Sequence, residues 1–264
     1  MATDSSMKEY SGGGDPARSL ALLWRKQNPR PTRNGKQNLS VDRIMLAAIE
    51  VADADGLGSL SMRRVAEKLG VGTMSLYTYV PGKGELLDLM LDTAYGETDK
   101  PDHDPGTPWR TRLEQVAREN WKLYHRHPWI LQAGVSRPPL GPNVMVKYEY
   151  ELRAVDGIGL THIEMDTVLN LVIGHAETAA RRDIESSITE KDSGMTDEQW
   201  WEKNGPLLST VMDHSRFPLA SAVGQAVGNT YGTAYDAAHN FEFGLQRILD
   251  GVQVLVDSRR LHQD

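Results

Sequence analysis

The chain of 264 residues is long enough for two domains, and its lack of cysteine excludes disulfides and thiolate metal sites, which fits a reducing cytoplasm. No apolar run approaches the roughly 20 residues of a membrane span, and the start MATDSSMKEY lacks a signal-peptide core, so we expect a cytoplasmic protein that does not contact a membrane. The net charge of −7 excludes a uniformly basic surface, so any affinity for nucleic acid must come from local basic contacts.

The first 38 residues read as a basic, partly disordered arm. Its start is polar and glycine-rich, and Ala17–Trp24 (ARSLALLW) is expected to form a short helix. The segment that follows is proline-broken and basic, and an extended segment of this kind can follow DNA phosphates or enter a minor groove. A merely solvated tail is the alternative, because a run of charge alone is weak support. The basic side chains concerned are Arg25, Lys26, Arg30, Arg33 and Lys36.

The next helix is expected to begin after Ser40, a suitable N-cap, and to end at Gly56. Behind it, apolar residues at i, i+3, i+4 and i+7 from Met62 to Leu69 predict a second helix, followed by Gly70 at a left-handed end. A third, short helix over Thr73–Tyr79 is closed by Val80-Pro81-Gly82. Two short helices across a glycine-bearing turn predict a helix-turn-helix, whose second helix enters the DNA major groove.

The rest of the chain is predicted to be helical, which gives an all-α fold. A helix from Lys83 has an inward apolar face of Leu86, Leu87, Met90, Leu91 and Ala94, and the proline-rich 101–108 is the expected domain boundary. We therefore divide the chain into the arm (1–38), a DNA-binding domain (39–97) and a larger helical domain (107–260). Within the last we expect helices at 109–126, 129–135, 143–155, 161–188 and 236–258, with a polar insertion at 189–204.

Residues 39–97 resemble the DNA-binding domain of the tetracycline-repressor (TetR) family. The resemblance is carried by S-M-R-R-V-A-x-K-L-G-V-G-x-x-x-L-Y-x-Y-V from Ser61 to Val80, followed by Lys83. More weakly, FEFGLQRILDG (Phe241–Gly251) resembles the family's last helix. The resemblance implies a homodimer formed through 161–188 and 236–258, a palindromic DNA operator, and a small-molecule effector bound in the carboxyl-terminal region. The apolar stripe of the last helix fits a four-helix interface, although an intramolecular core role is the alternative.

The resemblance also implies which residues contact DNA. Arg63 matches a base-contacting arginine, and arginine bidentate to guanine is a common specific pairing. Lys83 would hold a phosphate at a helix N-terminus. Arg64 is the weaker candidate, since it could pair with Glu67 instead. Thr73 and Met74 replace the glutamine and proline of the tetracycline repressor, which leaves the operator sequence open. The further expected DNA contacts are Ser61, Thr73, Met74, Ser75, Tyr77, Thr78 and Tyr79.

For the effector we expect a pocket of aromatic side chains with a few convergent polar groups. His125 and His127 lie some 200° apart around an ideal helix, which is poor for a shared metal, and no cofactor is expected. Gln132 stands where the tetracycline repressor has a histidine, so tetracycline–magnesium is not the expected ligand; a bulky, partly aromatic natural product or drug is. The candidate lining residues are Trp121, His125, Trp129, Gln132, Arg137, Tyr148, His175, Glu177, Arg181, Trp200 and Trp201.

These features predict a repressor that a small molecule releases from DNA, controlling an efflux or natural-product gene. An enzyme is disfavoured because the sequence has no paired catalytic carboxylates, P-loop, GxGxxG, HExxH or nucleophile elbow in a suitable setting. An activator, or another helical regulator that senses no ligand, remains the alternative.

Overall fold

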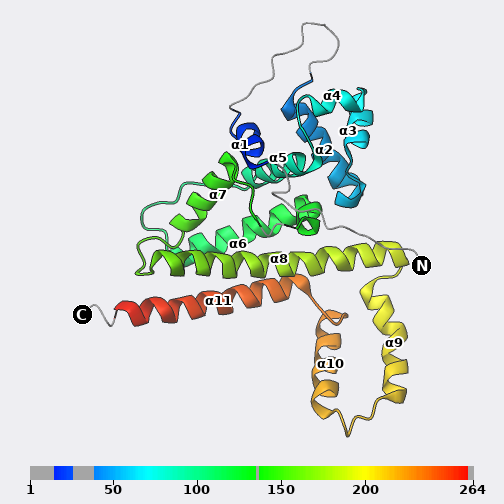
Figure 1. Cartoon of the computed structure of the whole chain (residues 1–264). Helices are drawn as coiled ribbons and strands as arrows, with labels where there is room; N and C mark the ends of the chain where they lie inside the picture. Colours follow the sequence, from blue (N-terminus) through cyan, green and yellow to red (C-terminus); the bar gives the residue numbers. More distant parts are fainter. Residues whose placement is uncertain (1–14, 26–38, 135–136, 261–264) are drawn as a thin grey trace. The chain divides into compact units, whose positions relative to one another are not determined.

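The computed structural model describes residues 15–25, 39–134 and 137–260. The described residues form helices and connecting segments without a β-strand, so the predicted all-α class is confirmed (Figure 1). The elements are α1 (Pro16–Leu23), α2 (Val41–Asp55), η1 (Leu57–Ser59), α3 (Met62–Leu69), α4 (Thr73–Tyr77), α5 (Lys83–Gly96), α6 (Trp109–Arg126), η2 (Pro128–Gln132), α7 (Pro142–Arg153), α8 (His162–Ser193), α9 (Asp197–Val211), α10 (Pro218–Tyr231) and α11 (Ala237–Arg260).

The chain divides into two compact units, Met1–Leu169 and Asn170–Asp264. This division does not fall at 101–108, because α5 packs against α7 across that segment. The proposed functional boundary at 101–108 therefore stays a prediction. None of the helices in the described ranges is long and apolar enough to cross a membrane.

The helix-turn-helix forms as its sequence predicts. The Ser40 hydroxyl accepts a hydrogen bond from the Arg43 amide and so caps α2, and Gly56 ends that helix with φ 77°. Gly70 ends α3 in the left-handed conformation, which other residues rarely adopt. Helix α4 stops at Tyr77 rather than the predicted Tyr79, because the amides of Tyr79 and Val80 both bond to the Leu76 carbonyl in a closing turn.

Helix α5 forms the centre of the first unit. Its predicted inward face is confirmed: Leu86, Leu87, Met90, Leu91 and Ala94 are all buried. It packs against α1, α2 and α7. The predicted helix at 17–24 is α1, capped by Asp15, whose own amide donates to the buried Glu85 carboxylate of α5 at 3.3 Å. At the other end of α1, the Trp24 indole donates to the Leu140 carbonyl at 2.9 Å.

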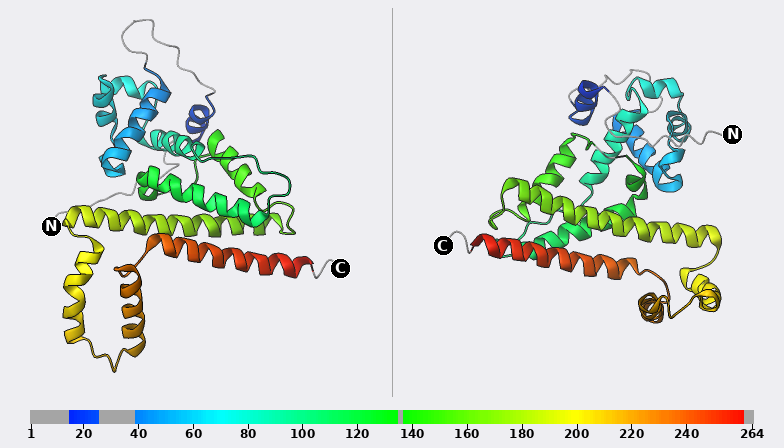
Figure 2. Two further views of the ribbon diagram at one scale, coloured as in Figure 1. Left: turned by 180° about the vertical axis from the view of Figure 1, so that it is seen from behind. Right: turned by 60° about the horizontal axis from the view of Figure 1, so that its bottom comes forward.

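Two parts of the carboxyl-terminal prediction were wrong. The expected helix at 129–135 is the 3-10 turn η2, which begins at Pro128 and ends at Gln132. The expected polar insertion at 189–204 is helical: α8 continues to Ser193, and α9 starts behind a capping box in which Thr196 and Gln199 each bond the other's backbone amide. Helix α10 follows and forms a hairpin with α9 (Figure 2).

Helix α11 carries the predicted apolar stripe, but the stripe is not exposed. Phe241, Leu245, Leu249, Val252 and Val256 are buried within the chain. His175 of α8 stacks on Phe241 with ring centroids 5.8 Å apart and its Nε2 lies 2.9 Å from the Phe241 carbonyl oxygen. The intramolecular role is therefore the one that the structure gives to these side chains.

Candidate nucleic-acid interface

Helix α4 has one buried and one exposed face. Leu76 is fully buried, as is Val80 just beyond the helix. On the opposite face Met74 is 78% exposed and Tyr77 is 42% exposed. Ser75 and Thr78 are also exposed, whereas Thr73 and Tyr79 are half-buried. The helix thus presents a methionine, hydroxyls and a phenol to solvent, groups that can contact phosphates, base edges and thymine methyls.

The two arginines of α3 differ in their partners. The Arg63 side chain is 83% exposed and its Nε donates to Glu67 Oε1 at 2.8 Å, a bond that, with the carboxylate charge, raises the pKa of the guanidinium. The alternative prediction that Arg64 pairs with Glu67 was wrong, because Arg64 Nη2 bonds to Asp55 Oδ2 of α2 at 2.6 Å. An exposed i,i+4 pair is weak, so DNA can compete for Arg63.

The other expected DNA contacts begin helices or precede them. The Ser61 hydroxyl accepts from the Arg64 amide and so caps α3. Lys83 is the first residue of α5, where free amides favour an anion. Arg25 pairs with Asp42 in the first turn of α2 and also donates to the Leu22 carbonyl. Lys26, Arg30, Arg33 and Lys36 lie outside the described residues.

A buried histidine joins the DNA-binding helices to the segment after α6. His127 is 5% exposed and lies between two carboxylates: Nδ1 is 2.7 Å from Asp53 Oδ1 of α2, and Nε2 is 3.0 Å from Glu97 Oε2 at the end of α5. The Trp129 indole donates to the same Asp53 oxygen at 2.8 Å, and Arg126 pairs with Glu97 at 3.2 Å. Burial acts to raise the pKa of Glu97, but His127 and Arg126 outweigh it and lower that pKa.

A second connection joins α5 to α7. The buried Asp92 carboxylate accepts from the Val144 amide at 3.0 Å and from Asn143 Nδ2 at 3.1 Å, and so caps the start of α7. A side chain at Gly141 would collide with this carboxylate, so glycine is needed for the approach. Burial raises the pKa of Asp92 despite these bonds. Helices α2 and α5 of the predicted DNA-binding domain are therefore bonded to both neighbouring helical segments of the first unit.

Between α6 and α7 lies a buried polar cluster that the sequence analysis missed. Asn120 is 1% exposed, and its Nδ2 donates to Glu151 Oε1 at 2.7 Å, while its Oδ1 accepts no hydrogen bond from any described residue. Lys147 pairs with Glu151, and both are buried. Nearby Lys100 has a lowered pKa, chiefly because of burial and also because of the Lys147 charge. One sequence feature could have indicated this cluster. Asn120 lies in phase with the buried stripe of α6, which includes Val116 and Leu123.

The predicted effector-binding residues are divided between the two units, with those up to Tyr148 in the first and those from His175 in the second. Trp129 is fully buried with its indole N–H bonded to Asp53, so it packs at the α2 junction, and its place in an effector pocket stays a prediction. Gln132 Oε1 accepts from the Leu57 amide at 2.9 Å. The others form local pairs or stand at the surface: Trp121 with His125, Tyr148 with Asp166, His175 with Phe241, Glu177 with Arg181, Trp200 with Trp201, and Arg137 exposed.

Trp201 also lines a cavity of about 970 Å³ in the second unit, between α9 and α10. Among the described residues there is no group of three or more histidines and carboxylates placed to hold a metal ion.

Two family models match the chain. The model of bacterial regulatory proteins of the tetR family matches residues 44–90, and that of the tetracyclin repressor-like C-terminal domain matches residues 100–256. The HTH-type transcriptional repressor DrrR1 of Streptomyces coeruleorubidus is 46% identical over 252 residues, 96% of this chain and 91% of that protein. The crystal structure of Streptomyces coelicolor ActR in complex with actinorhodin superposes with a TM-score of 0.69 at 27% identity, covering 83% of this chain and 97% of ActR.

The bonds to Glu97 predict that its charge stabilises the junction. We expect Glu97→Gln to lower the free energy of unfolding at pH 7 by about 1 kcal/mol, a charged hydrogen bond discounted for exposure. Because the pKa of Glu97 is lowered in the fold, its contribution is present above the ordinary value of 4.5 and is lost as the pH falls through the lowered pKa. Urea unfolding followed by circular dichroism between pH 3 and 7 measures the difference.

Glu149→Gln is the matched control for this prediction, since Glu149 forms an exposed pair with Arg153 on α7. It should change stability by less than about 0.5 kcal/mol. Equal effects of the two substitutions, or a Glu97 effect that does not diminish in acid, would contradict the assignment.

Proposed function

Because the chain belongs to the tetracycline-repressor (TetR) family, we propose that it is a homodimeric transcriptional repressor that binds a palindromic operator and is released by a small molecule. The observation that carries the proposal is the pair of partly buried hydrogen-bonded connections from α2 and α5 to the helices that follow. DrrR1 is a repressor by name, and ActR binds actinorhodin in its crystal structure. An efflux or natural-product gene is accordingly the proposed target.

On DNA, the exposed face of α4 enters the major groove. Met74 presses on a thymine methyl, and the hydroxyls of Thr73, Ser75 and Thr78 meet phosphates or base edges, while Tyr77 and Tyr79 hold the backbone. Helix α4 contains no lysine or arginine, so the attraction to phosphate comes from its neighbours. These are Lys83 and the basic segment with Lys26, Arg30 and Arg33. Two copies place their reading helices about 34–36 Å apart on the operator.

The homodimer forms through α8 and α11. Apolar side chains that these helices leave exposed support this: Leu171 and Ile188 on α8 are 53% and 47% exposed, and Phe243 and Val254 on α11 are 56% and 70% exposed. Such side chains are covered when two helix pairs meet as a four-helix bundle. The stripe that the sequence suggested for this role, including Leu245, is buried in the chain instead.

The effector binds between α6 and α7, at the cluster of Asn120, Lys147 and Glu151. Buried ions cost free energy unless they are well bonded, and they are commonly retained where a function needs them. Here the Asn120 Oδ1 is an acceptor without a donor in the described structure, next to a carboxylate and an ammonium. A ligand hydroxyl or phenol that donates to this oxygen would satisfy it, which favours hydroxylated aromatic compounds.

Release follows from the position of this cluster. The effector would contact α6 and α7, and the same two helices lead directly to the bonds with the DNA-binding helices: α6 to His127, and α7 to Asp92. A ligand that prefers a different spacing of α6 and α7 therefore also prefers a different placement of α2 and α5. Bound effector then lowers the affinity of the protein for its operator. Bound operator lowers the affinity for the effector by the same coupling free energy.

Two substitutions test the docking. We expect Lys83→Ala to weaken binding to all duplexes alike and to reduce the salt slope of log K by about 1, since a phosphate contact carries no sequence information. Arg63→Ala should relax base preference at one position and cost about 1–3 kcal/mol on the operator alone. Operators selected from random duplexes and fluorescence anisotropy at several salt concentrations provide the measurement.

Lys122→Ala serves as the control, because Lys122 pairs with Glu119 on α6 and should leave DNA affinity unchanged. If Lys83→Ala and Arg63→Ala bind every duplex as tightly as the parent chain, the docking is wrong.

A third substitution tests the effector site. Asn120→Leu keeps the approximate side-chain volume and removes the acceptor, so it should weaken the binding of a hydroxylated aromatic ligand at least tenfold. Actinorhodin, the ligand of ActR, is the first compound to titrate, by quenching of tryptophan fluorescence. Gln253→Leu on α11, where Gln253 bonds Asp257 at the surface, is the control. Undiminished binding to Asn120→Leu would place the effector elsewhere.

Coupling is tested separately. Asp92→Ala removes both bonds to the start of α7, so it should raise the actinorhodin concentration needed for release from DNA at least tenfold while leaving operator and ligand affinities within about threefold, if coupling of roughly 1–3 kcal/mol runs through this contact. The exposed Asp156→Ala is the control. Normal release from the Asp92 variant, shown by circular dichroism to be folded, would refute this route.

A further inference from the structure

Helix α1 precedes the part of the chain that either family model matches. Those models cover residues 44–90 and 100–256, whereas α1 spans Pro16–Leu23. An isolated helix of eight residues is at best marginal in water, so packing must stabilise α1. Leu22 and Leu23 are buried, and the helix packs against α5. Helix α1 is therefore a built part of the first unit that the family's two domains do not account for.

Helix α1 lies beside α5 over about two turns of that helix. At its start the Asp15 amide donates to the Glu85 carboxylate in the first turn of α5, next to Lys83. Just beyond its end, the charge of Arg25 lowers the pKa of Asp92 and so partly offsets the effect of burial. An eight-residue helix is about 12 Å long, which matches the distance along α5 from Glu85 to Asp92.

The two residues that follow α1 bond to other helical segments. The Trp24 indole donates at 2.9 Å to the carbonyl of Leu140, directly before the cap of α7. The Arg25 guanidinium pairs with Asp42 in the first turn of α2 at 2.5 Å and donates to the Leu22 carbonyl at 3.1 Å. Arg25 has φ 52°, a backbone conformation that costs free energy in a residue other than glycine and persists where the surroundings hold it.

We propose that α1 is a strap that joins the start of α7 to α2 and α5, and that Trp24 and Arg25 are positioning residues for effector release. This inference rests on the proposed function. A shift of α7 relative to α5 separates the Trp24 indole from the Leu140 carbonyl, as well as Asp92 from its own partners at the start of α7. The strap makes an arrangement in which α7 moves without α5 more costly, and this raises the coupling between effector and operator.

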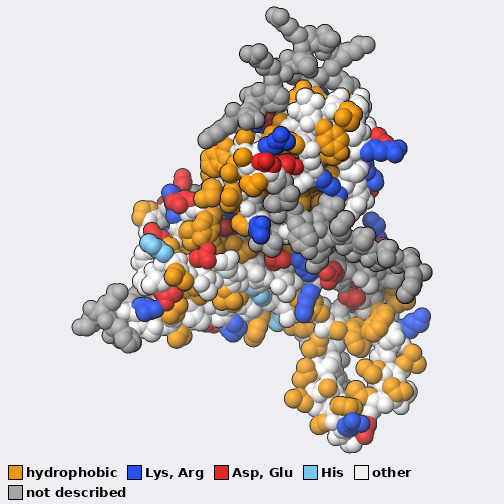
Figure 3. Space-filling view, viewed as in Figure 1, with side chains coloured by type: hydrophobic (Ala, Val, Ile, Leu, Met, Phe, Trp, Pro, Cys, Tyr) orange, Lys and Arg blue, Asp and Glu red, His pale blue; other side chains and the backbone are white. Residues whose placement is uncertain are grey.

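The strap lies on the surface of the first unit, so its last bond is not needed to fill the core. Trp24 is 46% exposed and Leu140 is 57% exposed. Figure 3 shows hydrophobic side chains at the surface over α1 and α7. Replacing Trp24 by phenylalanine removes the N–H group and keeps an aromatic ring, so it leaves the buried side of α1 intact. This substitution separates a role in coupling from a role in stability.

We expect Trp24→Phe to lower at least threefold the factor by which saturating actinorhodin weakens operator binding. The loss of one neutral hydrogen bond is worth a change of this size. Operator affinity without ligand and actinorhodin affinity without DNA should stay within twofold of the parent chain. Fluorescence anisotropy of a labelled operator measures the factor, and isothermal titration calorimetry measures the ligand affinity. A merely stabilising role would lower the melting temperature and leave the factor unchanged.

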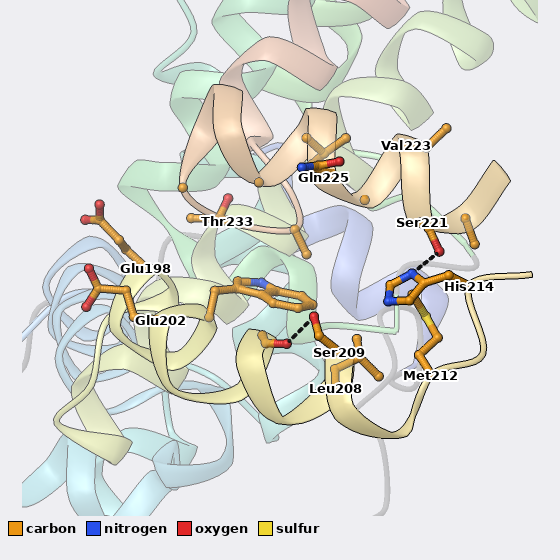
Figure 4. Close-up of a pocket in the computed structure, with 18 residues that line it drawn as sticks. Glu198, Glu202, Leu208, Ser209, Met212, His214, Ser221, Val223, Gln225 and Thr233 are labelled. Atoms are coloured by element: carbon orange, nitrogen blue, oxygen red, sulfur yellow. Dashed lines mark hydrogen bonds between the residues drawn. The ribbon is translucent and has the colours of Figure 1, made fainter. Parts of the chain in front are cut away.

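Two controls match the two parts of this substitution. Trp109→Phe makes the same chemical change on α6, where the indole donates to no described residue. Ser221→Ala removes a single side-chain contact in the second unit, where the Ser221 hydroxyl lies 3.0 Å from His214 Nδ1 (Figure 4). Both variants should keep the parent's factor. An unchanged factor in a folded Trp24→Phe variant would overturn the positioning role.

Hydrogen–deuterium exchange tests the strap without a ligand. Trp24→Phe should speed exchange at least threefold in peptides over 141–148, where the Val144 amide bonds to Asp92, and leave peptides of α11 unchanged. Unchanged exchange over 141–148 would show that α1 does not hold the start of α7.

The Asp92→Ala variant separates failure of the strap from failure of the proposed function. If Asp92→Ala weakens the response to actinorhodin while Trp24→Phe changes neither the response nor the exchange, the proposed function stands and the strap fails. If actinorhodin does not release the parent chain from its operator, release by this ligand fails, and the exchange measurement alone decides whether α1 holds α7.

Discussion

The hydrogen bonds of three carboxylates, those of Asp53, Asp92 and Glu97, connect α2 and α5 to the helical segments that follow them. Asp53 and Asp92 lie on the DNA-binding helices α2 and α5, and Glu97 follows α5, yet their partners come from segments beyond residue 125. Asp92 and His127 are each 5% exposed, so moving either away from its partner leaves a buried polar group unbonded, which has a substantial free-energy cost. The DNA-binding helices therefore cannot change position without His127, Trp129 or α7 changing as well.

Helix α5 transmits this constraint. Nine of its 14 residues are buried, including the acidic Glu85, Asp88 and Asp92, so it is enclosed on nearly all sides. A helix buried in this way moves as a rigid body or not at all, because close-packed surroundings do not deform continuously. Since α5 starts at Lys83, directly behind α4, a small shift at Asp92 reaches the end that we propose contacts DNA over the length of one helix.

The parts of the fold that the sequence predicted are those fixed by local chemistry. The helix caps are examples, because each cap bonds only within one turn of its own helix. The residue types alone therefore predicted the N-caps Ser40 and Ser61 and the left-handed end at Gly70. The start of α9 was missed although Thr196 and Gln199 form a capping box, since the polar residues around Trp200 were interpreted as an insertion. The sequence likewise gives no sign that the Trp129 indole bonds to Asp53, which lies 76 positions earlier.

The same distinction applies to the candidate DNA-contacting face and to the proposed effector site. The exposed face of α4 follows from helical periodicity, because Leu76 and Val80 must turn inward. Asn120, Lys147 and Glu151 meet only after α6 and α7 pack. The spacing within α6 indicates that Asn120 faces inward, but it does not indicate which residues of α7 Asn120 meets.

The acidic character of the DNA-binding domain lowers the coupling free energy between effector and operator that release requires. Residues 41–97 carry five basic and nine acidic side chains, and three of the basic ones, Arg63, Arg64 and Lys68, are paired with carboxylates of the same domain. DNA must therefore compete with these pairs for the cations, and non-specific binding to phosphate is correspondingly weak. In the proposed dimer, a domain that gains so little from charge would depend on two correctly spaced reading helices, so a displacement that changes their spacing would remove most of the affinity. Coupling of roughly 1–3 kcal/mol is then sufficient for release.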